Sequence, residues 1–479
     1  MENENRSPQK KTGLMIAIII SAVVIVALCI FGAVKFFSRS TMPEGYPVAS
    51  GEGTEFEGAG GAGASLSAGI VIGGETGTSS TDTAGSATVD SDTAGLSEDV
   101  DGDSAAEGIT DIEYAPEYLA AMEKAKEQMA GMTTEEKVAQ LFFVSFDALT
   151  EVSSSTVAGD ITRAKLLDYP VGGIILFAKN ITDPQQVSEL TKGLHEISAE
   201  NGGVPVMVGV DEEGGVVARI GGRNTFPEKN VGAMAEIGQA GDQASPEDIV
   251  RAKETGEYIG GYLKKYGFDI DFAPVVDVYT NPENTVIGTR AFGTTPERVT
   301  DMSEAFREGL EAQGVQSCIK HYPGHGDTQA DSHYGVAVTN KTLDELMACG
   351  FIPFQQSIRA GAKLVMVSHI SAPNVTGDMV PASLSNKMVN EILRGELGYD
   401  DVVVTDDLSM GAISQLYTPA EACIKSIQAG VDWVMVTTGF VEAYNGVLEA
   451  VQKGEISAER LDESVRRILI LKSRNGLLF

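Results

Sequence analysis

Short apolar runs rich in β-branched residues alternate with stretches of helical periodicity from about residue 111 to the end of the chain. The runs predict strands at residues 141–146, 173–177, 204–210, 269–276, 315–320, 363–367, 402–405 and 433–436. Such alternation is typical of a parallel sheet whose strands are connected by helices. Thr133 and Glu136 have the spacing of a capping box, which predicts a helix start just before the first run.

The number of runs favours an α/β fold built as a single (β/α)8 TIM-type barrel. Eight parallel strands close such a barrel, and domains of about 250 residues or more, with insertions, are ordinary for it. An open, doubly wound sheet is the structural alternative. No internal repeat of roughly 20–50 residues is visible, so a repeat architecture is not predicted.

The N-terminal part of the chain has a different pattern. Residues 14–34 form an uncharged, mostly apolar run of 21 residues. As a helix this run is about 31 Å long, enough to cross a bilayer. Arg6, Lys10 and Lys11 precede it, which predicts cytoplasmic residues 1–13 and a transmembrane signal anchor whose C-terminal end lies outside. A cleaved signal peptide is the alternative.

Residues 35–112 are expected to be a disordered linker rich in glycine, serine, threonine and acidic residues. Residues 41–112 contain 14 acidic residues and no lysine or arginine. Such a segment buries too little apolar surface to offset its ordering entropy. A globular domain is then expected over residues 113–479.

The whole chain is strongly acidic, which narrows the classes of partner. It has 35 lysines and arginines against 68 aspartates and glutamates, a formal net charge of −33. A general basic surface for nucleic acid is therefore excluded. The four cysteines are too few and too scattered for a disulfide framework, so cysteine usage leaves the compartment open.

Polar residues follow the ends of several predicted strands. They occur in the segments VDEEGG, KHYPGHGD, SHISAP and TDDLSM. In a barrel the C-terminal ends of the strands meet on one face, which is the usual active-site face. One carboxylate after a strand is equally well explained as a helix N-cap. Four such segments in one domain favour a shared site.

One of these segments raises the question of a metal. Residues 320–335 contain His321, His325 and His333, three of the chain's five histidines. A proline and a glycine separate the first two, so they do not share a helical face, and His195 lacks the second histidine of a helical zinc motif. We therefore expect no metal. Motifs for a serine nucleophile or a phosphate-binding loop are also missing from the sequence.

Acid–base chemistry fits the same segment better. Asp331 lies two residues before His333, and an aspartate that accepts from one ring nitrogen raises the basicity of the other. Asp406 and Asp407 end the seventh predicted strand, so one of them can enter the site as a nucleophile. A carboxylate nucleophile with a separate proton donor is the equipment of retaining glycoside hydrolysis. The usual donor is a second carboxylate, so a histidine would be a departure.

The ordered series of motifs resembles glycoside hydrolase family 3, in its bacterial β-N-acetylhexosaminidase branch. The resemblance extends over about residues 130–475 and rests on MTTEEKVAQLFF, GGIILFAKNI, VDEEGG, FAPVVDV, VIGTRAFG, KHYPGHGDTQADSHYG, TDDLSMGAI and ERLDESVRRILILKS. Several of these are weak alone, but the full series is specific. The branch implies one (β/α)8 barrel without a second sandwich domain.

The resemblance also implies roles for individual residues. Asp406 matches the nucleophile, His333 the unusual general acid/base on a mobile loop, and Asp331 its partner. Sugar-binding roles carry over to Asp211, Arg219, Arg290, Lys320 and His321. We expect a structural role for His325 and leave His369 open. The branch implies neither a metal nor an organic cofactor.

The main departure from the usual motif is Val216, which stands where the branch commonly has an arginine. No catalytic group is replaced. The resemblance implies release of terminal β-linked N-acetylglucosamine from cell-wall, muropeptide-type glycans. The predicted anchor and linker would place the domain outside the cell membrane, in the cell-wall zone. A phosphorylase or β-glucosidase of the same family, and a catalytically silent wall-binding protein, remain alternatives. Aglycone preference and oligomeric state are left open.

Overall fold

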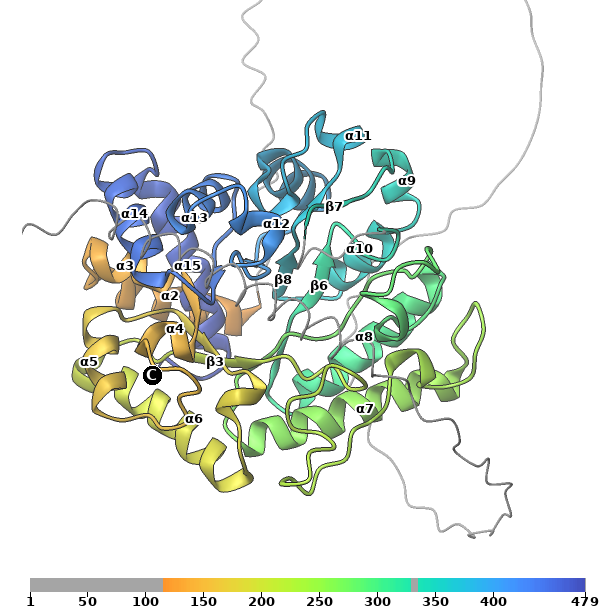
Figure 1. Ribbon diagram of the computed structural model, residues 1–479, viewed down its shortest axis with the longest axis horizontal. Coiled ribbons are helices and arrows are strands. Elements are labelled where there is room, and N and C mark those ends of the chain that lie inside the picture. The colour runs from red at the N-terminus through yellow and green to blue at the C-terminus, as the bar shows by residue number, and fades with distance from the viewer. Residues whose placement is uncertain (1–114, 329–334, 479) are drawn as a thin grey trace, which may run out of the picture. The chain divides into compact units, whose positions relative to one another are not determined.

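The computed structural model describes residues 115–328 and 335–478 (Figure 1). The chain divides into two units, Met1–Asp103 and Ser104–Phe479, and the described residues all belong to the second. The predicted anchor (residues 14–34) and linker (residues 35–112) lie outside the described residues and stay predictions. Within 115–328 and 335–478, no helix is both long and apolar enough to cross a membrane.

The strands occur where the apolar runs predict them. They are β1 (Phe142–Ser145), β2 (Gly173–Ile175), β3 (Met207–Val210), β4 (Ile270–Asp271), β5 (Gln316–Ser317), β6 (Ile319–Tyr322), β7 (Ala337–Val338), β8 (Leu364–Val367), β9 (Ile370–Ser371), β10 (Val402–Thr405) and β11 (Val434–Val436). The short pair of β7 and β9 was not predicted from the sequence.

Helices separate most of these strands and lie on their outer side (Figure 1). They are α2 (Pro116–Ala130), α3 (Thr134–Gln140), α4 (Phe146–Thr150), α5 (Asp160–Asp168), α6 (Pro184–Ser198), α7 (Pro246–Lys265), α8 (Pro296–Ala312), α9 (Leu343–Met347), α10 (Phe351–Arg359), α11 (Pro373–Thr376), α12 (Gly411–Ser414), α13 (Pro419–Gln428), α14 (Phe440–Gln452), α15 (Ala458–Arg474) and the π-helix η6 (Lys387–Glu396).

The strands pair in parallel, in the order β11-β1-β2-β3-β4-β5 and β10-β8-β6. Parallel bridges join Val275 to Lys320 and Val404 to Trp433. The series of neighbours therefore returns to the strand from which it started. The predicted α/β fold with parallel strands is confirmed.

The predicted fourth and fifth strands are less regular than the apolar runs suggest. Pro274 lies within the fourth run and has no N–H to donate, and β4 ends at Asp271. The ladder resumes beyond it, because Lys320 donates its N–H to the Pro274 carbonyl at 3.2 Å and Val276 donates to the Lys320 carbonyl at 2.8 Å. This irregular stretch carries the polar residues of the fifth strand end.

Several helix starts are capped by side chains. The predicted capping box at Thr133 is confirmed: its hydroxyl accepts from the Glu136 N–H at 3.2 Å, and the Glu136 carboxylate accepts from the Thr133 N–H at 2.8 Å. The same reciprocal box begins α7, α9 and α13. Each box satisfies two backbone donors that a helix terminus otherwise leaves unpaired.

Three aromatic rings pack among aliphatic side chains in the interior between the strands. Phe143 packs edge-to-face on Phe272, with ring centroids 5.3 Å apart, and on Trp433 at 5.2 Å. Gly173 on β2 makes room for this cluster, because a Cβ there would lie 2.1 Å from the Phe143 ring. The glycine that opens β2 is therefore required by close packing.

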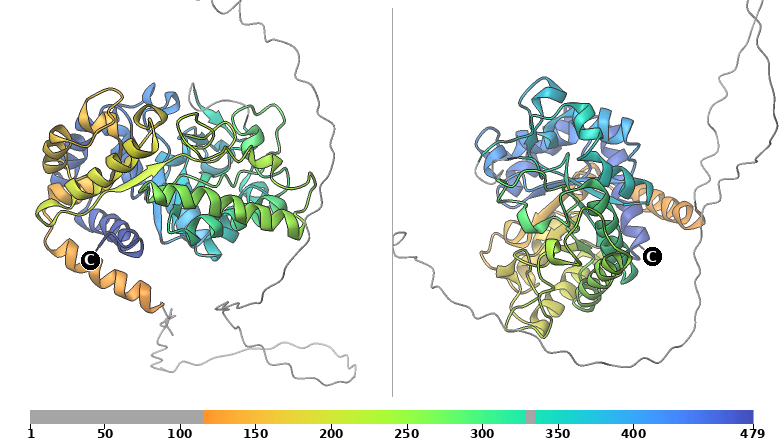
Figure 2. Two further views of the ribbon diagram at one scale, coloured as in Figure 1. Left: turned by 90° about the horizontal axis from the view of Figure 1, so that it is seen from below. Right: turned by 90° about the vertical axis from the view of Figure 1, so that its right-hand side faces the viewer.

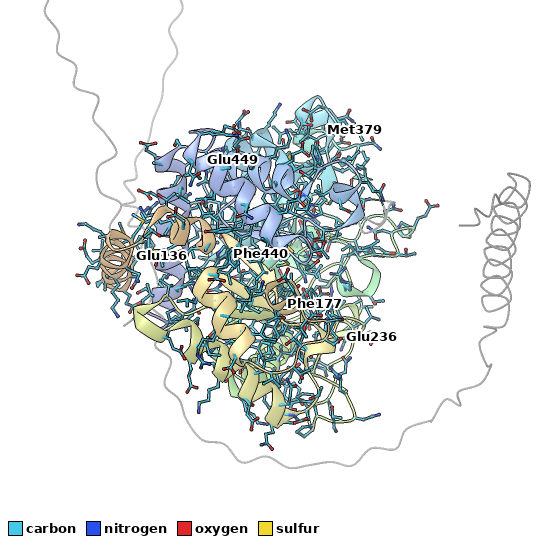
Figure 3. All side chains as sticks on the ribbon, turned by 60° about the vertical axis from the view of Figure 1, so that its left-hand side comes forward. Glu136, Phe177, Glu236, Met379, Phe440 and Glu449 are labelled. Atoms are coloured by element: carbon cyan, nitrogen blue, oxygen red, sulfur yellow. The ribbon has the colours of Figure 1, made fainter. Side chains whose placement is uncertain are left out.

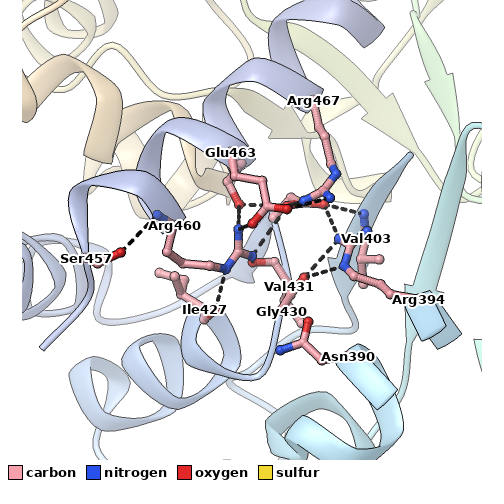
Figure 4. A network of polar contacts seen from close by, with 12 residues as sticks. Asn390, Arg394, Val403, Ile427, Gly430, Val431, Ser457, Arg460, Glu463 and Arg467 are labelled. Carbon is pink, nitrogen blue, oxygen red and sulfur yellow. Dashed lines mark hydrogen bonds and ion pairs between the residues drawn. The ribbon is translucent and has the colours of Figure 1, made fainter. Parts of the chain in front are cut away.

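A buried charge network ties the starts of β10 and β11 to η6 and α15 (Figure 4). Asp432 is fully buried and accepts from Arg394 at 2.6 Å and from the Ser464 hydroxyl at 2.7 Å. Arg460 and Arg467 each lie 3.4 Å from the same carboxylate. Burial alone would raise the pKa of Asp432, but the three arginines hold it at about 2. The amino ends of β10 and β11 are therefore stabilised by an ionised carboxylate paired with arginines.

Helix α2 covers the same end of the strands. It packs against α15 (Figure 2) and buries Ala121 and Ala125. A cleft of about 500 Å³ separates part of α2 from Gln316 and Lys363, which stand at the starts of β5 and β8. The described chain therefore begins at the amino ends of the strands.

Candidate active site

A pocket of about 340 Å³ opens at the opposite, carboxyl ends of the strands. Six residues predicted for the site from the sequence line it: Asp211, Arg219, Arg290, Lys320, His321 and Asp406. The apolar part of its wall includes Phe177, which follows β2 and is labelled in Figure 3. Asp331 and His333 lie outside the described residues, so their roles stay predictions.

Three consecutive acids after β3 have three different surroundings. Asp211 accepts from the Lys320 ammonium at 3.0 Å. Glu212 is buried and accepts from the Tyr262 hydroxyl at 2.8 Å and from the backbone N–H groups of Arg219, Ile220 and Gly221. It thereby fixes the segment that carries Arg219, whose guanidinium lies 3.9 Å from Asp211.

The turn after these acids requires glycine. Gly214 has a φ of +90° and Gly215 a φ of +56°, a region that is open to glycine but strained for most other residues. The turn brings the chain back so that Gly214 and Val217 form an antiparallel bridge. Val217 thus reaches the pocket wall while Val216 stays exposed.

Glu213, the third acid, holds two predicted sugar-binding cations. Its carboxylate accepts from Arg290 at 2.7 and 2.8 Å and lies 2.6 Å from the Lys320 ammonium. Burial by itself raises the pKa of Glu213, but the charges of Lys320 and Arg290 outweigh it and hold that pKa below its ordinary value. Conversely, burial alone would lower the pKa of Lys320, but Glu213 and Asp211 raise it. All three side chains are charged at neutral pH.

His321 is oriented by a buried aspartate. Its Nδ1 lies 2.7 Å from Asp277, which also accepts from the backbone N–H of His325 at 2.7 Å. Because Asp277 accepts from Nδ1–H, Nε2 is left as an acceptor, and the Arg290 guanidinium lies 3.3 Å from it. Burial raises the pKa of Asp277, but the neighbouring His321 outweighs this and lowers it. The ring is therefore held in a fixed orientation at the pocket wall.

The two aspartates after β10 differ in environment. Asp407 accepts from the Thr437 hydroxyl at 2.5 Å and from the Ser409 N–H at 2.9 Å, and burial raises its pKa. Asp406 accepts from the Asp407 N–H at 2.8 Å. Burial raises the pKa of Asp406 as well, but the nearby His369 and His321 outweigh it and lower that pKa. The two neighbouring carboxylates are therefore shifted in opposite directions, with the pKa of Asp406 lowered and that of Asp407 raised.

The two remaining described histidines near the site are buried. His325 Nδ1 lies 2.7 Å from the Thr328 hydroxyl, and burial lowers its pKa. His369, whose role was left open, lies between the Ser383 hydroxyl at 2.8 Å and the Asp407 carbonyl at 2.9 Å, and so supports the segment that carries Asp406. Within the part of the chain that the structure describes, no group of three or more histidines, cysteines, aspartates or glutamates could hold a metal ion.

Sequence reasoning missed Glu212, Glu213 and Asp277. Asp277 directly follows the fourth apolar run, so the rule that singled out the other strand ends would also have found it. The two glutamates lie in VDEEGG, one of the segments that follow a predicted strand, but their position alone does not show what they contact. In a chain of this charge an acidic run is usually solvent-exposed, and only the fold shows that both are buried.

Parallel strands with helical connections, and a pocket of charged and hydrogen-bonding groups at the carboxyl ends of the strands, match the arrangement of barrel enzymes, whose active sites lie at that face. Residues 133–471 match the family described as "Glycosyl hydrolase family 3 N terminal domain", and the chain belongs to this family. The resemblance inferred from the motifs is confirmed.

Relatives of this chain are β-hexosaminidases. "Beta-hexosaminidase LpqI" of Mycobacterium tuberculosis is 38% identical over 325 residues, covering 65% of this chain and 78% of the relative. "Beta-hexosaminidase A" of Pseudoalteromonas piscicida is 34% identical over 328 residues, but this chain spans only 54% of its length. A glycoside hydrolase family 3 β-N-acetylglucosaminidase structure from Paenibacillus sp. str. FPU-7 is 38% identical with a TM-score of 0.66, covering 72% of this chain and 63% of that one.

Proposed function

We propose that this protein is a retaining, exo-acting β-N-acetylglucosaminidase that removes terminal N-acetylglucosamine from cell-wall, muropeptide-type glycans. The observation that carries the proposal is the ionised Asp406 in a pocket walled by Asp211, Lys320, Arg290 and His321. The names of the relatives support the hexosaminide class. The closed series of parallel pairings supports a single (β/α)8 barrel.

In this mechanism the Asp406 carboxylate attacks the anomeric carbon and forms a covalent glycosyl ester while the glycosidic oxygen leaves. His333, oriented by Asp331, donates a proton to that oxygen and then removes one from the water that cleaves the ester. Both residues are assigned by resemblance. The paired charges around Lys320 and Arg290 cannot rotate freely, so they can hold sugar hydroxyls in one orientation.

The cellular setting completes the proposal. The uncharged run at residues 14–34 would anchor the chain in the cell membrane, and the acidic linker at residues 35–112 would extend the domain into the cell-wall zone. A reporter fused after residue 112 should be active outside the cytoplasm and remain in the membrane fraction. A cytoplasmic reporter would refute this location.

A chromogenic panel tests the chemistry. The protein should release the aryl group from a β-N-acetylglucosaminide faster than from a β-glucoside, equally with and without phosphate, and equally with and without EDTA. Acceleration by phosphate would indicate a phosphorylase, and preference for the glucoside would indicate a β-glucosidase. Inhibition by EDTA that zinc reverses would indicate a metal enzyme, and binding without turnover a silent glycan-binding protein.

A further inference from the structure

Glu213 stands at the junction of two cationic side chains that the proposed mechanism uses to hold the sugar. One of its oxygens accepts from the Arg290 Nη2 at 2.7 Å and lies 2.6 Å from the Lys320 ammonium. The other accepts from the Arg290 Nε at 2.8 Å. A carboxylate has about four acceptor positions, and three of them are occupied. Glu213 lines the pocket but is only 3% exposed, and most of its hydrogen-bonding capacity is used within the protein.

We propose that Glu213 is a positioning residue for the glycosidase reaction, which sets the spacing and the charge of Lys320 and Arg290 without itself binding the sugar. The inference rests on the proposed function, because it concerns how that site holds its substrate. Glu213 thus has a different role from Asp211. Asp211 also accepts from Lys320, but its second cationic neighbour is Arg219, at 3.9 Å.

The contacts around Glu213 form one continuous series of hydrogen bonds and ion pairs. It runs Asp277, His321, Arg290, Glu213, Lys320 and Asp211. Glu213 is the member that separates the two cations. Without its charge, Lys320 and Arg290 would repel each other in a buried site, where such interactions are weakly screened. A shift of about 1 Å in a group that positions substrate can cost about 100-fold in rate.

The consequence for Lys320 is specific and measurable. The titratable and charged groups facing it are Glu213, Asp211, Arg219, Asp271, Arg290, Cys318, His321 and Asp406. Burial and Arg290 act to lower the pKa of Lys320, and Glu213 is the largest influence that raises it. Removing the Glu213 charge therefore moves the pKa of Lys320 downward. The ammonium would then lose its proton at a pH where the unaltered protein keeps it.

The test compares Glu213→Gln with Glu213→Asp in the full chain. For Glu213→Gln we expect kcat/KM on an aryl N-acetylglucosaminide to fall about 100-fold. We also expect KM to rise on the alkaline side at a pH where the KM of the unaltered protein stays flat, because the pKa of Lys320 is lowered. Glu213→Asp keeps the charge but is shorter, so it should restore the flat KM profile while recovering only part of kcat/KM. A purely structural role would change the melting temperature without changing the pH profile.

Glu304→Gln is the matched control, because Glu304 also pairs with a buried arginine, Arg307, but on the outer helix α8. It should leave kcat/KM and its pH profile unchanged. A Glu213→Gln protein that is folded by circular dichroism and has normal kcat/KM and a flat KM profile would overturn the inference. So would equal alkaline KM rises in Glu213→Gln and Glu213→Asp. Failure of the unaltered protein on N-acetylglucosaminides would refute the proposed function instead, and the comparison would then use whichever aryl glycoside it cleaves.

Discussion

Lys472 provides a test of buried electrostatics far from the pocket. Its side chain is fully buried, and its amine donates to the Gln140 side-chain oxygen and to the Pro205 carbonyl, each at 2.8 Å. Two acceptors match the two N–H groups of a neutral amine but leave one donor of an ammonium unused. Burial lowers the pKa of Lys472 from 10.5 to about 7, against an opposing effect of Asp269.

The pH dependence of stability follows from this difference. The folded-state pKa is depressed, so between about pH 7 and pH 10.5 the unfolded chain binds a proton that the folded protein does not. Stability therefore rises with pH across this window, by up to about 1.4 kcal/mol per pH unit and about 5 kcal/mol in all. Between pH 6 and pH 9 the gain should be roughly 2 to 3 kcal/mol.

Lys472→Met removes the titrating group and keeps most of the apolar stem. The free energy of unfolding should be measured by urea titration of both proteins at several pH values from 6 to 9. The free energy of unfolding of the unaltered protein minus that of the variant should increase by roughly 2 to 3 kcal/mol between pH 6 and pH 9. Lys192→Met is the control, because that side chain is 73% exposed, and its difference should be flat. A flat difference for Lys472→Met, or one that grows toward acid pH, would refute the reasoning.

Three further predictions concern the reaction. Asp406→Ala should abolish turnover because no glycosyl ester can form, and azide should restore some rate with inverted product. If Asp406→Ala keeps near-normal activity and Asp407→Ala is inactive, the nucleophile is Asp407 instead. His333→Ala should slow glycosides with poor leaving groups far more than activated aryl glycosides, and an equal loss across aryl groups of graded acidity would exclude the acid role. Asp277→Asn removes the charged acceptor that orients His321, so KM should rise about tenfold or more, and an unchanged KM in steady-state kinetics would contradict that role.

Strands such as β1, β3, β8 and β10 could be predicted because they are buried on both faces and form apolar runs. The ladder irregularity could not, because it depends on how Pro274 meets the neighbouring strand. Site residues that directly follow an apolar run, such as Asp406, could be predicted because the run itself could be recognised. The sequence does not indicate which residue a given side chain will pair with in the fold. That Glu213 pairs with Arg290, 77 positions away, is a property of the folded chain.

Lys472 illustrates the limit of local patterns. It lies in the last turn of α15, where a lysine ordinarily interacts with the helix C-terminus and solvent. Nothing in its neighbours distinguishes it from Arg474, two residues on, which is partly exposed. Only the packing of α15 against α3 and the connection before β3 buries the amine.

The position of α2 has a practical consequence for handling the protein. Because this helix crosses the amino ends of the strands, Pro116 lies on the side facing away from Asp406 and its neighbours. A solid support, fluorophore or affinity handle coupled just ahead of Pro116 would therefore be attached on the face opposite the pocket. Bulky polymeric glycans, including insoluble wall fragments, could then approach an unobstructed mouth, whereas coupling through the β3–α7 connection would place the support across it.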